Sequence, residues 1–166
     1  MHASAQRVVD EARARGLAIE VREFHEGTHT AADAAQAIGV EVGQIVKCLA
    51  FRAGDEVVLA LVSGENRLDE RALGEAAGVS RRAIRRADAA AVRAATGFAI
   101  GGVPPFGHPA PLRTFLDRDL LRYDVVWAGA GTPRHVFSVD PRELARVTGA
   151  VVADLSTRSA EPPSPA

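Results

Sequence analysis

The chain has 166 residues and a net charge of −1, with 47% hydrophobic and 25% charged residues. This length predicts one domain with a buried core, and the near-neutral charge excludes a general attraction to DNA or to a membrane surface. Cys48 is the single cysteine, which excludes an internal disulfide and favours a reducing compartment. The sequence has no signal-peptide pattern and no apolar run of about 18 residues, so we expect a cytoplasmic protein.

Helical and strand-like patterns alternate along the chain. Helices are indicated where apolar residues recur at helical spacing between a capping residue and a glycine, and strands where apolar residues alternate or form short runs. The predicted helices are 5–15, 30–39, 69–77 and 88–96, with a fifth that starts at Asp140. The predicted strands are 17–21, 45–51, 57–62, a short one around Ile84, 112–116, 125–128, 136–139 and 150–153.

This order of elements indicates the fold class. Short strands mixed with short helices, and a polar turn at 52–56 that joins two strands into a hairpin, predict an α+β fold with a mixed sheet. We expect one domain over residues 1–155. The tail 156–166 is rich in proline and serine and is predicted to be disordered.

One cation stands in the middle of an apolar strand. Of the 20 Lys and Arg residues, Lys47 is the only lysine. Strands disfavour lysine and burial of its charge costs free energy, yet lysine and arginine are not equivalent where a compact ammonium is needed. Two interpretations are open at this point: Lys47 is a functional ammonium, or it is a gatekeeper that blunts an exposed strand edge.

The segment His25-Glu26-x-x-His29 has the ligand spacing of a zinc peptidase helix. It contains Gly27 and stops where Thr30 begins the next helix, so we expect a loop, in which the two imidazoles do not share a helix face. No third ligand is signalled. We therefore predict no metal and no cofactor, and we interpret both histidines as surface or pocket-lining residues.

The loop 101–107 is rich in glycine and proline. Gly101 and Gly102 would let the backbone approach a ligand closely, while Pro104 and Pro105 would stiffen the loop. From the residues alone, a structural crossover loop remains the alternative to a ligand-binding loop.

Gly129-x-Gly131 follows a predicted strand and resembles half of a dinucleotide-binding loop. The third glycine is missing and a strand is expected next, so a plain turn is favoured.

The arginines at positions 81, 82, 85 and 86 form the strongest local positive patch. They form either a solvated face or a surface that would contact a phosphate backbone without sequence specificity.

Four segments occur in a specific order along the chain: Thr30–Ala35, Gln44–Lys47, Gly101–Gly107 and Val126–Gly131. Together they resemble the YbaK/ProX family of aminoacyl-tRNA deacylases, whose members also occur as the editing domain inserted in bacterial-type prolyl-tRNA synthetases. The resemblance covers about residues 25–155. It implies a compact domain with a mixed, partly barrel-like β-sheet flanked by short helices.

The resemblance also implies roles for individual residues. Lys47 matches the family's strand lysine and would hold the terminal phosphate or adenosine of the tRNA. Backbone N–H groups near Gly101 and Gly102 would position the carbonyl oxygen of the ester. Pro104 departs from the small polar residue that the family often has, and the resemblance assigns no role to His135. The predicted substrate-binding residues are Pro105, Phe106, His25, Gly129 and Gly131.

The function implied by the resemblance is that of a free-standing trans-editing hydrolase. Its substrate would be an aminoacyl-tRNA, with the tRNA for proline carrying a small wrong amino acid as the expected form, and prolyl-tRNA synthetase is a possible partner. Water would attack the ester, assisted by a ribose hydroxyl. Two alternatives stay open: Lys47 forms a Schiff base, or the domain binds tRNA or a synthetase without chemistry.

Overall fold

The structure, a computed structural model, describes residues 2–24 and 30–157. In these ranges, helices α2 to α5 each begin at a residue whose side chain accepts a main-chain N–H and end at a glycine with positive φ. These local signals explain why the predicted helices agree with the observed ones. The α-helices are α1 (Ala3–Ala14), α2 (Ala31–Ile38), α3 (Glu70–Ala77), α4 (Ala89–Thr96) and α5 (Pro141–Thr148). The 3-10 helices are η1 (Val42–Gln44), η2 (Arg81–Ala83) and η3 (Arg118–Arg122).

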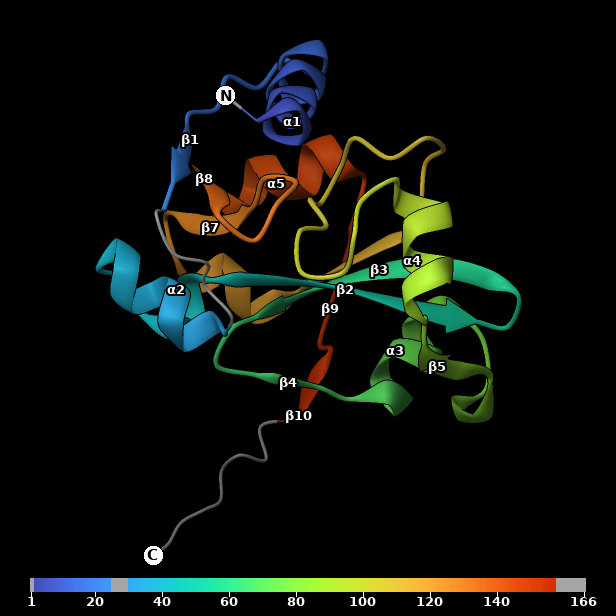
Figure 1. Cartoon of the computed structure of the whole chain (residues 1–166). Helices are drawn as coiled ribbons and strands as arrows, with labels where there is room; N and C mark the ends of the chain where they lie inside the picture. Colours follow the sequence, from blue (N-terminus) through green and yellow to red (C-terminus); the bar gives the residue numbers. More distant parts are fainter. Residues whose placement is uncertain (1, 25–29, 158–166) are drawn as a thin grey trace, which may run out of the picture.

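A five-stranded mixed sheet forms the centre of the molecule. Its strands β2 and β3 make the predicted antiparallel hairpin, with Lys47 opposite Val62, whereas β6 runs parallel to both of its neighbours. Figure 1 shows β2 and β3 crossing the middle of the fold. In spatial order the strands are β5 (Ile84–Arg86), β2 (Val46–Ala53), β3 (Glu56–Ser63), β6 (Thr114–Asp117) and β9 (Val151–Ala153).

Two smaller sheets lie on either side of the central one (Figure 1). One has the antiparallel order β1-β8-β7 and is linked to the start of β2 by a bridge between Ile45 and Trp127. The other is the antiparallel pair β4 and β10. The predicted α+β fold with a mixed sheet is confirmed, and the sheets of the described residues do not close into a barrel. These strands are β1 (Val21–Glu23), β7 (Val126–Gly129), β8 (His135–Val139), β4 (Arg67–Leu68) and β10 (Ser156–Thr157).

The core is divided by the central sheet because successive side chains of a strand point to opposite faces. Leu59 and Leu61 of β3 pack on one face together with α1, α4 and α5, and Val58 and Ala60 pack on the other face with α3. Full burial of a leucine side chain contributes about 1.5–3 kcal/mol. The strand β3 is therefore the main apolar element on which both halves of the core are assembled.

Two expectations need correction. The alternation at 17–21 does place Leu17 and Ile19 against the core, but strand pairing begins only at Val21, where β8 becomes the partner. At the other end, Ser156 pairs with Leu68, so the ordered chain extends beyond the boundary expected at 155. No helix in the described ranges is long and apolar enough to cross a membrane.

Candidate active site

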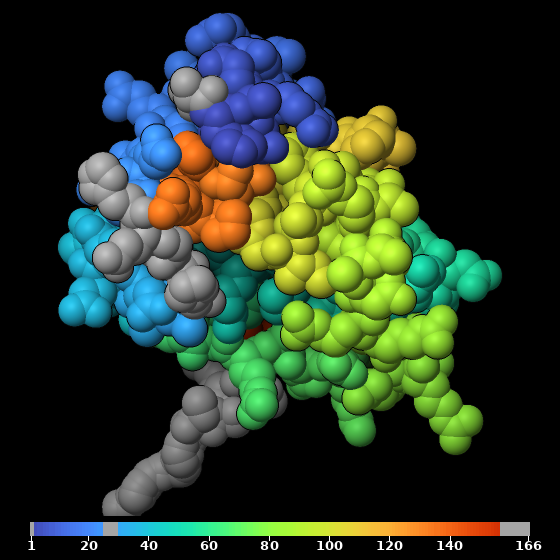
Figure 2. All heavy atoms as spheres, in the orientation of Figure 1, coloured from blue at the N-terminus to red at the C-terminus, as the bar shows by residue number. Residues whose placement is uncertain are grey.

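A cavity of about 650 Å³ opens at the edge of β2. Among the described strands, β2 pairs with β5 only over residues 51–53, so residues 46–49 pair with β3 alone and leave one edge open. Figure 2 shows the hollow on this face, where teal atoms lie recessed below the orange and yellow segments. The walls come from the N-terminal turn of α2, the loop at 101–103, strand β7 and the turn at 132–136.

Lys47 lines this cavity and is half-buried. Its ammonium donates a hydrogen bond to the main-chain oxygen of Asn66, in the turn between β3 and β4. Burial lowers the pKa of Lys47 from its ordinary value of 10.5; the carboxylate of Asp117 acts against this shift and Arg67 adds to it. A gatekeeper on an exposed edge would extend into solvent, whereas Lys47 is held in place beside the cavity.

The two glycines predicted to act together have different environments. Gly101 lines the cavity with φ +94°, and an added Cβ would meet only the ring of Pro133, at 3.9 Å. Gly102 lies behind the wall, where a Cβ would come within 2.8 Å of the Cα of Thr132. Its N–H donates to the carbonyl of Ala99 at 3.0 Å, so it is already used inside the loop. The predicted donor role is therefore corrected for Gly102.

Pro105 and Phe106 are buried within the fold, away from the cavity wall. The Phe106 ring packs against Phe137 with 5.7 Å between ring centroids. His108 makes a hydrogen bond of 2.9 Å to the carbonyl of Pro104, which fixes the loop from behind. The expectation of direct substrate contact by Pro105 and Phe106 is corrected: they support the loop that carries Gly101.

The other predicted substrate-binding residues also differ in whether they line the cavity. Gly129 lines the cavity as part of β7. Gly131 has φ +96°, and an added Cβ would come within 2.9 Å of the Ser4 carbonyl, so it permits close packing against α1 instead. His25, with His29, lies outside the described residues.

His135 is a polar residue of the cavity for which sequence analysis predicts no role. It is 4% exposed, and its Nδ1 lies 2.5 Å from the hydroxyl of Thr132, which also lines the cavity. Burial lowers the pKa of His135, and the nearby carboxylate of Glu23 opposes the shift. The imidazole and the hydroxyl give this part of the cavity wall a polar character. Only the alternation of strand β8 could have indicated that His135 points inward.

Within the arginine patch, Arg86 alone lines the cavity, with its guanidinium 5.5 Å from the centre of the Phe51 ring. Arg81 is paired with Glu70 at 2.8 Å. Of the sequence-predicted patch, one cation therefore reaches the site. It stands at the end of β2 beyond Lys47, where both cations face the same cavity.

The remaining chemistry of the cavity is limited. Burial raises the pKa of Cys48 to about 12, which keeps this thiol protonated and unreactive. Within residues 2–24 and 30–157, no group of three or more His, Cys, Asp or Glu side chains could hold a metal ion. The described site thus offers one ammonium, one guanidinium, one imidazole, the hydroxyls of Thr30 and Thr132, and main-chain groups, which suit the binding and polarisation of an anionic or ester-bearing ligand.

Fold and site together define a small α+β domain whose ligand cavity lies at the open edge of a mixed sheet. Residues 25–147 match the aminoacyl-tRNA editing domain, and the chain belongs to this family. The predicted resemblance is confirmed, as is the prediction of an aminoacyl-tRNA deacylase that acts in editing.

Three relatives illustrate the similarity. A solved structure of a candidate trans-editing enzyme for prolyl-tRNA synthetase is 49% identical, with a TM-score of 0.89, and the match covers 95% of this chain and 99% of that one. Protein YwhH of Bacillus subtilis (strain 168) is 32% identical over 126 residues, which are 75% of this chain and 78% of YwhH. The proline–tRNA ligase of Thermoanaerobacter sp. (strain X514) is 30% identical over 104 residues, which are 62% of this chain and 18% of the ligase.

Proposed function

We propose that this chain is a free-standing, cytoplasmic trans-editing enzyme that hydrolyses the ester of the tRNA for proline when it carries a small wrong amino acid. The observation that carries the proposal is the cavity that Lys47 and Gly101 both line. The similarity to a candidate trans-editing enzyme for prolyl-tRNA synthetase supports this choice of tRNA. Prolyl-tRNA synthetase is the proposed partner, and neither DNA nor a membrane is.

In the proposed mechanism, the 3′ end of the tRNA enters the cavity with its terminal adenosine along the open edge of β2. The Lys47 ammonium holds the terminal phosphate or adenosine and fixes the position of the ester. The N–H of Gly101, on the cavity wall, stabilises the carbonyl oxygen as negative charge develops. A water molecule attacks the carbonyl carbon, and the vicinal ribose hydroxyl assists it.

Three further residues complete the proposal. Arg86 contacts a phosphate nearer the acceptor stem, a sequence-independent interaction that adds affinity. The pair His135 and Thr132 faces the amino-acid side of the cavity and hydrogen-bonds the substrate's amino group or a water. Gly101 and Gly129 carry no side chains, so the amino acid of the substrate would contact main-chain atoms at this wall.

The deciding experiment is a deacylation panel under single-turnover conditions. The panel holds tRNA for proline charged with alanine, cysteine, serine or proline, and tRNA for alanine charged with alanine. Selective release of one small amino acid from the tRNA for proline is expected, and it should persist in EDTA. Binding of the charged tRNA with the ester left intact would favour the non-catalytic alternative. Borohydride trapping of Lys47 on a carbonyl compound would favour the Schiff-base alternative.

A further inference from the structure

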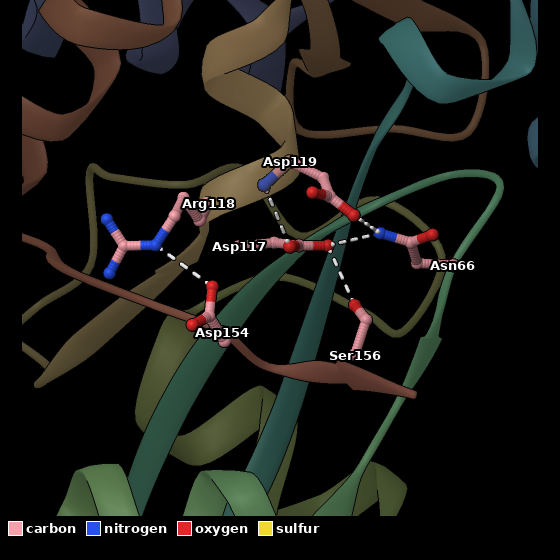
Figure 3. A network of polar contacts seen from close by, with 6 residues as sticks. All are labelled: Asn66, Asp117, Arg118, Asp119, Asp154 and Ser156. Carbon is pink, nitrogen blue, oxygen red and sulfur yellow. Dashed lines mark hydrogen bonds and ion pairs between the residues drawn. The ribbon is translucent and has the colours of Figure 1, made fainter. Parts of the chain in front are cut away.

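A buried carboxylate lies on the side of the central sheet that faces away from the glycine loop. Asp117, at the end of β6, is 2% exposed. Its Oδ2 accepts hydrogen bonds from the N–H of Ser63 (3.1 Å), the side-chain amide of Asn66 (3.0 Å) and the hydroxyl of Ser156 (2.9 Å), and its Oδ1 accepts the N–H of Asp119 (3.1 Å). Figure 3 shows Asp117 at the centre of this network. The four donors offset the cost of burying the carboxylate.

Asn66 connects the network to the cavity. Its side-chain amide donates to the carboxylates of Asp117 and of Asp119, the latter at 2.8 Å, so this side chain is held between the end of β6 and the 3-10 helix η3 (Figure 3). The main-chain oxygen of the same residue accepts the Lys47 ammonium. Because the side chain fixes the turn, it also fixes the position of the oxygen that holds Lys47.

The last strand joins the network from a distant part of the sequence. Ser156 belongs to β10, which pairs with β4 immediately after Asn66, with Ser156 opposite Leu68. The N–H of Asp69 also donates to the carbonyl of Leu155 at 2.7 Å. The turn that carries Asn66 is therefore held on one side by Asp117 and on the other by the C-terminal strand.

We propose that Ser156, Asp117 and Asn66 are positioning residues that fix the Lys47 ammonium beside the cavity, so that strand β10 acts on deacylation through Lys47. This inference rests on the role proposed above for Lys47. None of the three side chains lines the cavity, and each reaches the reaction through the Asn66 carbonyl. Two charges act on the pKa of Lys47 in opposite directions: Asp117 raises it and so favours the charged ammonium, whereas Arg67 lowers it.

The first test reads Lys47 directly and needs no activity. Because the chain has a single lysine, isotope-labelled lysine gives one side-chain NMR signal, whose shift is followed against pH. Asp117→Asn should lower the apparent pKa of Lys47, Arg67→Gln should raise it, and Ser156→Ala should shift or broaden the signal. Asp154→Asn is the matched control, because it breaks only the exposed ion pair with Arg118 drawn beside the network in Figure 3. An unchanged signal in Asp117→Asn and Ser156→Ala overturns the proposal.

The second test is a double-mutant cycle in single-turnover deacylation. Asn66→Ala should slow the reaction about 10-fold and Ser156→Ala about 3-fold, since small misplacement of a positioned group costs rate. In a Lys47→Ala background neither substitution should cost anything further, because their effect passes through Lys47. Equal losses in both backgrounds would make the network merely structural and sink the inference. Ser156→Ala decides alone if Asn66→Ala does not fold.

The two tests separate two kinds of failure. If the wild-type chain deacylates no tRNA of the panel, the proposed function fails while the NMR titration still decides whether the network holds the ammonium. If deacylation is found and the NMR signal ignores the network, the inference fails and the proposed function stands.

Discussion

The two walls of the cavity hold their functional groups in different ways. On the β2 wall, Lys47 is fixed by a hydrogen bond to a turn and by charges from other strands. On the loop wall, the backbone is the proposed functional element, held by the positive φ of Gly101 and by the close approach of Gly102 to Thr132. The first wall therefore depends on the identity of one side chain, whereas the second depends on the absence of side-chain atoms.

The largest expected effect is therefore at Lys47. We expect Lys47→Ala and Lys47→Arg both to fold and to lose on the order of 10²-fold in single-turnover deacylation, as when a preorganised electrostatic contact is removed. Arginine keeps the charge, but its planar fork does not fit a half-buried position that holds a compact ammonium. Near-normal activity of Lys47→Arg would show that charge alone matters at this wall. Soluble yield measured alongside tests the gatekeeper alternative, under which only Lys47→Ala would aggregate.

The next largest effect is expected at the loop wall, where substitution of its two glycines should have different consequences. Gly101→Ala should slow deacylation about 10-fold, because it strains the backbone at the cavity surface. Gly102→Ala should instead lower the free energy of unfolding by about 1–3 kcal/mol, since its Cβ would overlap the Thr132 main chain. Rate constants and urea unfolding of both variants are compared. If Gly102→Ala is as stable as the wild type, the predicted difference between Gly101 and Gly102 is wrong.

A smaller effect is expected at Pro105. It is buried in the loop that carries Gly101, so Pro105→Ala should loosen the wall rather than remove a contact. We expect the rate on the preferred substrate to change about 3-fold at most, with a broader range of amino acids accepted in the deacylation panel. Unchanged selectivity would mean that the loop is rigid without this proline.

Much of the fold could be predicted because its signals are local. Asp88 and Gly97 bound a helix in the sequence and in the structure, since a cap and a left-handed glycine act within one turn. The strand predicted at 17–21 is shifted because its hydrogen bonds depend on β8, more than 100 residues away in sequence. Alternation shows which residues are buried, but it does not show where pairing starts.

The site could be predicted only in part, for the same reason. Lys47 can be predicted as a candidate site residue because its rarity and its apolar neighbours are visible in the sequence. Its partners Asn66 and Asp117 cannot, because they approach it only through the turn after β3 and the end of β6. Gly102 and Gly131 are predicted to contact the ligand. A sequence does not distinguish a glycine that makes room for a ligand from a glycine that makes room for another segment of the chain.

The smallest expected effect is a loss of stability at mildly acidic pH. It should depend on histidines of the loop wall and not on Lys47. Burial lowers the pKa of both His108, which holds the carbonyl of Pro104, and His135 below the ordinary value of 6.5. In the unfolded chain these rings bind protons near that value, so below it the unfolded state binds more protons than the folded state. Their contribution is complete above pH 6.5 and is lost as the pH falls toward the lowered values.

We therefore expect the free energy of unfolding, measured in urea at pH 8, 6.5 and 5.5, to fall over the acidic interval. Replacing both histidines by glutamine should flatten this dependence, since glutamine cannot take up a proton, while Lys47→Ala should leave it as it is. An equal slope in the double glutamine variant would assign the pH dependence to other titratable groups. In that case the loop wall would be held by packing alone, and its histidines would be fixed spacers whose protonation does not matter to the fold.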